Sequence, residues 1–138
     1  MADPVPAAGP AFPDPEVAAE VRRVPKPWGH ELWFAVTARY VGKILHVEAG
    51  EALSLQYHER KEETIHVLRG TLDLELDDAA GQLRTHRLTA GNTAHIAAGR
   101  RHRMRAVDTV DLCEVSTPEL DDLVRIEDRY GRVPSDPA

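Results

Sequence analysis

The stretch Gly50-Glu-Ala-Leu-Ser-Leu-Gln56-Tyr-His58-Glu-Arg-Lys-Glu-Glu63-Thr-Ile-His-Val-Leu-Arg-Gly70 decides how this chain folds and where its chemistry lies. Gln56 and His58 are two residues apart, so on a β-strand both side chains point to the same face. Glu63 begins the next apolar run after a short polar turn, and His102 follows a later turn. If the strands close on one another, these four side chains can meet at a metal ion.

Short apolar runs separated by turn residues fill the chain from about residue 24 onward. Several runs alternate with a period of two, as Leu72, Leu74 and Leu76 do between their polar neighbours. Many short alternating segments are typical of an all-β sandwich or barrel, and residues 77–82 predict a hairpin turn between two of them. The expected strands are residues 31–35, 40–47, 52–57, 64–68, 71–76, 83–88, 93–97, 102–107 and 110–116.

The two ends of the chain depart from this pattern. Residues 1–20 are rich in proline and alanine and predict a flexible tail, with one helical turn near residues 16–21. The remaining residues, 21–138, are expected to form the folded domain. Leu120, Leu123, Val124 and Ile126 have roughly helical spacing and precede Gly131, so we expect a C-terminal helix at about residues 119–130.

Size and charge restrict the class of protein. A chain of 138 residues predicts one domain, and a net charge of -6 gives no electrostatic footprint for nucleic acid. The single cysteine, Cys113, cannot form an internal disulfide and fits a reducing compartment. No charged leader with an apolar stretch and no run of membrane-spanning length is present in the sequence. These features predict a cytoplasmic protein without nucleic-acid or membrane partners.

The spacing G-x5-Q-x-H-x4-E-x6-G from Gly50, and G-x5-A-x-G-x2-H from Gly91, closely resembles the paired motifs of the cupin superfamily. Three stretches, at residues 26–29 (Lys-Pro-Trp-Gly), 53–58 and 124–132, look like the C-terminal domain of type II mannose-6-phosphate isomerases. In that family glutamine replaces the first motif histidine, as Gln56 does here. The resemblance covers about residues 26–132 and implies a single-domain cupin, a double-stranded β-helix or jelly-roll barrel.

The resemblance implies that Gln56, His58, Glu63 and His102 bind a divalent metal ion. Two imidazoles, an amide oxygen and a carboxylate suit Zn, Mn, Fe, Co or Ni, and this ligand set does not choose among them. Gln56 beside His58 could instead be a satisfied polar pair. The other histidines match no ligand position: His30, His46, His66, His86 and His95.

The activity that the resemblance implies is metal-dependent aldose–ketose isomerisation of a phosphosugar. Such chemistry moves a proton between adjacent carbons through an enediol. The candidates for the group that carries the proton are Glu63, Lys43 and Glu114. The candidates for contacts to an anionic substrate are Arg60 and Lys61 in the turn, and Arg129 and Arg132 in the expected helix. The alternative for Arg60 and Lys61 is a solvated charged turn, and the alternative for Arg129 and Arg132 is helix capping or surface charge pairing.

One departure from the isomerase pattern concerns the residue after the motif glutamate. The family has His-Trp there, whereas Thr64 and Ile65 follow Glu63, which removes a possible acid/base histidine. Two alternatives to the isomerase therefore stay open: an Fe-dependent cupin dioxygenase, and a non-catalytic cupin that binds a sugar or an effector. The expected partners are a small anionic sugar and, by resemblance, a second copy of the chain in a homodimer.

Overall fold

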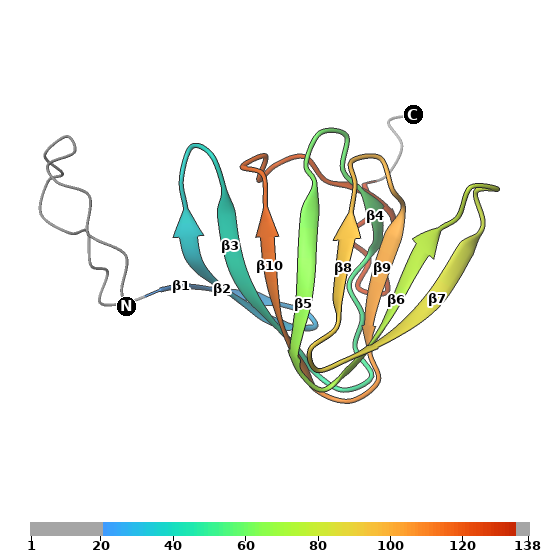
Figure 1. The fold of residues 1–138 in the computed structure, drawn as a ribbon, viewed down its shortest axis with the longest axis horizontal. Coiled ribbons are helices and arrows are strands. Elements are labelled where there is room, and N and C mark those ends of the chain that lie inside the picture. Colours follow the sequence, from blue (N-terminus) through green and yellow to red (C-terminus); the bar gives the residue numbers. More distant parts are fainter. Residues whose placement is uncertain (1–20, 135–138) are drawn as a thin grey trace, which may run out of the picture.

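The computed structural model describes residues 21–134, which form eleven strands and no helix (Figure 1). The strands lie in two antiparallel sheets, one with the order β1-β2-β3-β10-β5-β8 and one with the order β11-β4-β9-β6-β7. The strand bounds are β1 Arg22–Lys26, β2 Gly29–Val36, β3 Val41–Val47, β4 Leu55–Tyr57, β5 Glu63–Arg69, β6 Thr71–Asp77, β7 Leu83–Thr89, β8 Thr93–Ile96, β9 His102–Ala106, β10 Val110–Ser116 and β11 Val124–Glu127.

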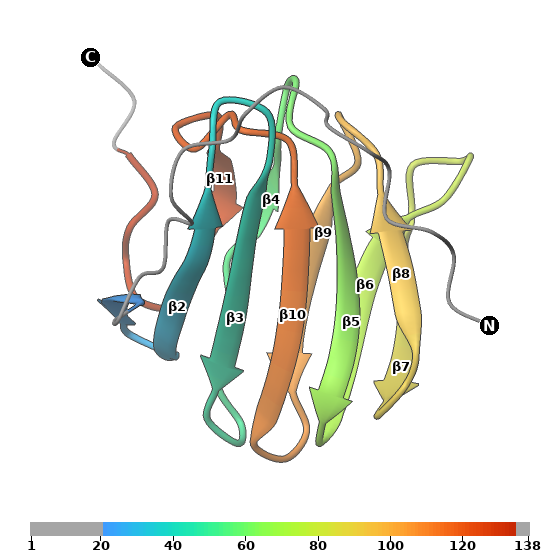
Figure 2. The same ribbon diagram turned by 60° about the vertical axis from the view of Figure 1, so that its left-hand side comes forward.

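The two sheets face each other and enclose the apolar core between them (Figure 2). Alternation decides which side chains enter this core: in β5, Ile65 and Val67 are fully buried, whereas His66 and Leu68 are exposed. The buried cluster consists of Trp28, Leu45, Val47, Ile65, Val67, Leu72, Leu74, Ile96, Met104, Ala106, Val110 and Leu112. This architecture confirms the predicted all-β jelly-roll barrel.

All nine strands expected from the alternation are present, with ends shifted by a few residues. The hairpin predicted at residues 77–82 is also present, because the amide of Asp78 donates to the carbonyl of Gln82 at 2.8 Å. The turn between β5 and β6 needs a glycine: Gly70 has φ +89°, and a Cβ there would lie 2.2 Å from the carbonyl oxygen of Thr109. Because glycine has no Cβ, this turn can pack directly against the backbone of the β9–β10 connection.

The predicted C-terminal helix at residues 119–130 is wrong. Residues 117–123 form a loop, and strand β11 pairs with β4, placing Val124 opposite Tyr57 and Arg125 opposite Gln56. Without β11, β4 would be an open sheet edge with free backbone hydrogen-bonding groups, and pairing outweighs a weak helical periodicity. The tail predicted for residues 1–20 lies outside the described part of the chain. Within residues 21–134, no helix long and apolar enough to cross a membrane is found.

Candidate metal centre

Three polar side chains converge at one end of the barrel. Glu63 is the first residue of β5, His102 is the first residue of β9, and His58 lies just after β4. The β4–β5 and β8–β9 loops emerge at this same end, at the top of Figures 1 and 2. His58, Glu63 and His102 are 5%, 2% and 1% exposed, and one nitrogen or oxygen of each lies within 4.8 Å of the others.

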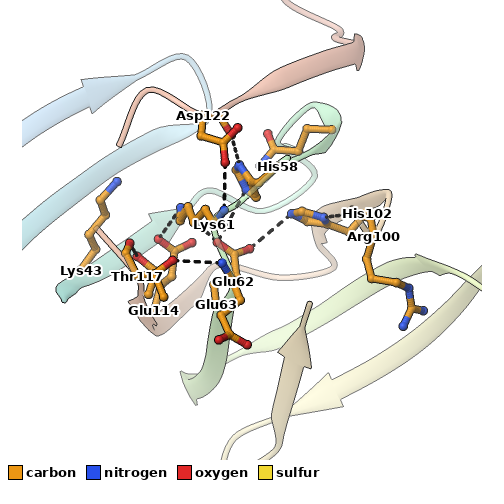
Figure 3. A network of polar contacts seen from close by, with 12 residues as sticks. Lys43, His58, Lys61, Glu62, Glu63, Arg100, His102, Glu114, Thr117 and Asp122 are labelled. Atoms are coloured by element: carbon orange, nitrogen blue, oxygen red, sulfur yellow. Dashed lines mark hydrogen bonds and ion pairs between the residues drawn. The ribbon is translucent and has the colours of Figure 1, made fainter. Parts of the chain in front are cut away.

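The separations between these atoms are those of ligands that share one ion. His58 Nε2 lies 3.8 Å from Glu63 Oε2, and His102 Nε2 lies 3.3 Å from Glu63 Oε1 (Figure 3). Donors that are each about 2.1 Å from a metal ion are separated by roughly 3–4 Å. The described geometry therefore suits a small divalent cation.

Backbone carbonyls fix the proton on each imidazole. His58 Nδ1 donates to the carbonyl of Asp122 at 2.6 Å, and His102 Nδ1 donates to the carbonyl of Arg100 at 2.9 Å. A carbonyl can only accept, so Nδ1 carries the hydrogen in both rings and Nε2 presents its lone pair to Glu63. Metal-binding histidines typically have this arrangement, in which the outer nitrogen is held by a hydrogen bond.

Three inner atoms of the cluster are buried and have no hydrogen-bond partner among the described residues: His58 Nε2, His102 Nε2 and Glu63 Oε1. The other carboxylate oxygen, Glu63 Oε2, has only the Lys61 ammonium close to it. Buried polar atoms are almost always satisfied, because each one left without a partner costs free energy. Nitrogen lone pairs facing a carboxylate need a cation between them. A proton would satisfy one pair of atoms, whereas a metal ion satisfies both imidazoles and the carboxylate at once. The residues present therefore fit a metal ion.

Gln56 lies beside the cluster. It is the register partner of His102 between β4 and β9, so both side chains point to the same face of the sheet. Its amide oxygen accepts a hydrogen bond from the Ser54 hydroxyl at 2.7 Å. A carbonyl oxygen has a second lone pair, so this contact leaves Gln56 able to act as the predicted fourth ligand.

Lys61 is buried next to the cluster, although its place in a charged turn predicts a solvated side chain. Its Nζ lies 3.1 Å from Glu63 Oε2 and 3.5 Å from Glu114 Oε2. The carboxylate of Asp122 accepts hydrogen bonds from the backbone amides of residues 59, 60 and 61 at 3.0, 2.6 and 2.9 Å. These bonds hold the turn in the conformation that points Lys61 inward (Figure 3).

The charges in this cluster move the pKa values of its members. Burial opposes ionisation of Glu63, but the close contact with the His102 ring and the Lys61 ammonium hold its pKa below the usual range. Burial and the negative charge of Glu63 raise the pKa of Glu114 to about 8. Burial also lowers the pKa of His58, which favours the neutral imidazole that a metal ion requires.

A pocket of about 310 Å³ opens beside the cluster. It is lined by His58 together with Arg22, Lys26, Lys43, Gln56, Lys61 and Glu114. Lys43 Nζ lies 3.4 Å from Glu31 Oε1, and both side chains are buried. The structure thus brings Lys43, Lys61 and Glu114 of the sequence-based candidates to one pocket with His58 and Gln56.

Three other candidates lie elsewhere. Arg60 is exposed and borders a separate hollow formed with residues 118–122. Arg129 donates to the carbonyl of Gly50 at 2.6 Å, and Arg132 Nε lies 2.8 Å from Asp128 Oδ2. Gly50 belongs to the turn after β3, at the end of the barrel opposite the metal ligands (Figure 1). The structure therefore does not bring Arg60, Arg129 or Arg132 into the pocket.

Thr64 faces away from the cluster. It follows the inward-facing Glu63 on β5 and is opposite Val115 and His95, whose side chains are exposed on the outer face of the sheet. A histidine at position 64 would point outward as well. The departure from the isomerase pattern at Thr64 therefore removes no group that could reach the metal ligands.

The sequence pattern gave no indication of Asp122, which holds the turn through contacts across more than sixty residues. An aspartate in a loop is a common acceptor for backbone amides, but its partner is set by the tertiary fold. Glu31 and Arg22 were missed for the same reason, since only the pairing of β1, β2 and β3 turns them toward the pocket. Lys26 was also not named as a site residue, but it lies in the Lys-Pro-Trp-Gly stretch that resembles the isomerase family, and that stretch is a signal that could have found it.

Comparison with known proteins defines the class of this chain. The cupin domain family model matches residues 43–116, which is more than half of the chain. The chain therefore belongs to the cupin domain family.

Curated relatives are considerably longer proteins. Mannose-1-phosphate guanylyltransferase ManC of Salmonella typhimurium is 32% identical over 117 residues, covering 81% of this chain and 23% of that protein. Xanthan biosynthesis protein XanB of Xanthomonas campestris is 32% identical over 116 residues, covering 80% and 24%. Alginate biosynthesis protein AlgA of Pseudomonas aeruginosa is 31% identical over 112 residues, covering 78% and 22%. This chain spans about a quarter of their length.

Solved structures share the fold at low identity. Oxalate decarboxylase from Bacillus subtilis superposes with a TM-score of 0.70 at 13% identity, covering 83% of this chain and 32% of that chain. The capsular polysaccharide assembling protein CapF from Staphylococcus aureus superposes with a TM-score of 0.65 at 14% identity, covering 78% and 34%. At such identities the likeness supports the barrel architecture and no particular activity.

Proposed function

We propose that this cupin is a metal-dependent isomerase that interconverts the aldose and ketose forms of a phosphosugar. The observation that carries the proposal is the buried His58–Glu63–His102 cluster, in which His58 lines a pocket together with Lys43, Lys61 and Glu114. Metal donors beside proton-transfer groups are what enediol chemistry requires. Relatives named for mannose 1-phosphate support a phosphosugar as the substrate.

His58, Glu63 and His102, with Gln56 as fourth ligand, would hold the ion. When bound, it would polarise the carbonyl and the neighbouring hydroxyl of the sugar. Glu63 faces both imidazoles and Lys61, so its two oxygens are committed to the cluster. It is therefore a poor base for the substrate.

Glu114 is the better candidate for moving the proton. It lines the pocket, and Lys61 Nζ lies 3.5 Å from its Oε2 atom. We propose that Glu114, in its ionised form, removes the proton from one carbon through Oε2 and returns it to the adjacent carbon. Its pKa of about 8 makes turnover rise as the pH increases toward 8. Lys61 holds this carboxylate in place, and Lys43, held by Glu31, faces the same pocket.

The test uses protein stripped of metal and reloaded separately with Zn, Mn, Fe, Co or Ni. We expect at least one ion to support conversion of mannose 6-phosphate to fructose 6-phosphate, with solvent deuterium appearing at C1 of the product. Glu114→Gln should bind the same amount of metal and lose turnover. Glu119→Gln, on the nearby loop outside the pocket lining, is the matched control and should retain turnover. Metal-loaded protein that isomerises no phosphosugar in a panel would contradict the proposal.

The same samples address the two alternatives. Oxygen consumption by the iron-loaded form would indicate a dioxygenase, and sugar binding without turnover would indicate a binding module. We also propose the homodimer and the cytoplasmic location implied by the sequence, and sedimentation analysis of the purified protein tests the former.

A further inference from the structure

Strand β1 presents one of its faces to the pocket. Arg22, Val24 and Lys26 alternate along the strand and all three line the pocket. Val24 is opposite Glu31 and Arg22 is opposite Trp33 in the pairing with β2, and both of these partners also line the pocket. One wall of the site is therefore built by β1, which no sequence motif for metal binding includes.

Among residues 21–134, no carboxylate neutralises the two charges on this wall. The other cations of the pocket have carboxylate partners, with Lys43 paired to Glu31 and Lys61 paired to Glu63. Within residues 21–134, neither Arg22 nor Lys26 has a carboxylate within 4.0 Å. Carboxylates are not scarce, because the chain has 23 acidic against 17 basic residues. Two uncompensated cations on a pocket wall mark a place where an anion would be stabilised.

Trp33 orients two of these cations. The Arg22 guanidinium carbon lies 4.6 Å from the centre of the indole ring, and Lys43 Nζ lies 4.5 Å from the same point. The ring itself is fixed, because its Nε1 donates to Glu31 Oε1 at 2.8 Å. Cation–π contacts of this kind hold the charges in position before a ligand arrives, which reduces the entropy that binding costs.

We propose that the β1 wall, through Arg22 and Lys26, binds the phosphate of a monosaccharide phosphate whose other end reaches the metal ligands. This inference rests on the proposed function and specifies where the anionic group of that substrate lies. The planar fork of arginine suits a phosphate, and two cations match its two charges at neutral pH. A pocket of about 310 Å³ is at the small end of ligand sites, which favours a monosaccharide over a nucleotide sugar.

The test compares two adjacent arginines on opposite faces of β1. Arg22→Gln removes a charge from the pocket, whereas Arg23→Gln removes one from the other face, where Arg23 is opposite Leu32 and contacts His30. Binding of mannose 6-phosphate, glucuronate and mannose to metal-loaded protein is measured by isothermal titration calorimetry. We expect Arg22→Gln and Lys26→Gln each to weaken mannose 6-phosphate binding about tenfold. Mannose binding, metal content and Tm should stay unchanged.

Equal dissociation constants for mannose 6-phosphate in Arg22→Gln and Arg23→Gln would overturn the inference. Failure of the wild-type protein to bind mannose 6-phosphate more tightly than mannose would also overturn it, and tighter binding of glucuronate would overturn the phosphate assignment. The proposed isomerase fails separately. If mannose 6-phosphate binds in an Arg22-dependent way but is not turned over, the phosphate site on β1 is supported and the isomerase activity is excluded. If the protein turns over mannose 6-phosphate and Arg22→Gln does not change the rate, the isomerase activity is supported and the phosphate site on β1 is excluded.

Discussion

Lys61→Met should destabilise the metal-free protein by about 3 kcal/mol. Lys61 is 7% exposed and its Nζ lies 3.1 Å from Glu63 Oε2 and 3.5 Å from Glu114 Oε2. Breaking a buried ion pair on one side costs about 3–5 kcal/mol, because the remaining charge is left uncompensated. We place the loss at the lower end, since a pKa of about 8 keeps Glu114 mostly protonated at pH 7 and leaves one unpaired carboxylate.

The assay is urea unfolding at pH 7 in a chelator, with Arg60→Met as the control. Arg60 is the adjacent basic residue but is exposed, so its replacement should change the free energy of unfolding by less than about 0.5 kcal/mol. The loss in Lys61→Met should increase as the pH rises through about 8, where Glu114 ionises beside Glu63. Metal should raise the Tm of Lys61→Met more than that of the wild type, because a divalent ion replaces the missing charge. Equal stability of Lys61→Met and Arg60→Met would refute this reasoning.

Three further predictions concern other parts of the barrel. Asp122→Asn keeps one oxygen that can accept from the amides of residues 59–61, so it should weaken metal binding about tenfold. Asp122→Ala removes both oxygens and should weaken metal binding by up to about 100-fold, as measured by competition with a chelator. A hydrogen bond to Asp111 raises the pKa of His46, so the wild type should exceed His46→Gln in stability by at most about 1 kcal/mol below pH 6.5. That advantage should vanish in unfolding curves as the pH rises through the raised pKa. Gly70→Ala should unfold at lower urea than Gly91→Ala, because both have positive φ but only Gly70 has a backbone neighbour in the way.

The strands of the core were predictable because their signal is local. Alternation alone places Leu72 and Leu74 inside, and the structure finds both fully buried. The same rule places Gln56 on the face of the sheet that carries His102, since paired residues on neighbouring strands share a face. The motif spacing predicted that His58, Glu63 and His102 lie together, and the loops at one end of the barrel bring one nitrogen or oxygen of each within 4.8 Å of the others.

The features that escaped prediction depend on long-range pairing. Strand β11 forms because β4 offers an edge, and the spacing of Leu120 and Leu123 instead reflects two side chains that line the pocket. Lys61 points inward because Asp122 holds its turn from a distant loop. Arg129 lies at the opposite end of the barrel because β11 runs away from the metal ligands, which no local pattern could indicate.

Metal binding by the His58–Glu63–His102 cluster can be measured directly as the metal content of the purified protein after dialysis against each candidate ion. We expect about one equivalent of a divalent first-row metal in the wild-type protein, and its loss in His58→Ala and His102→Ala. His66→Ala, on the outer face of β5, should retain the full equivalent. A wild-type protein that binds no metal, or His58→Ala with unchanged metal content, would contradict the account.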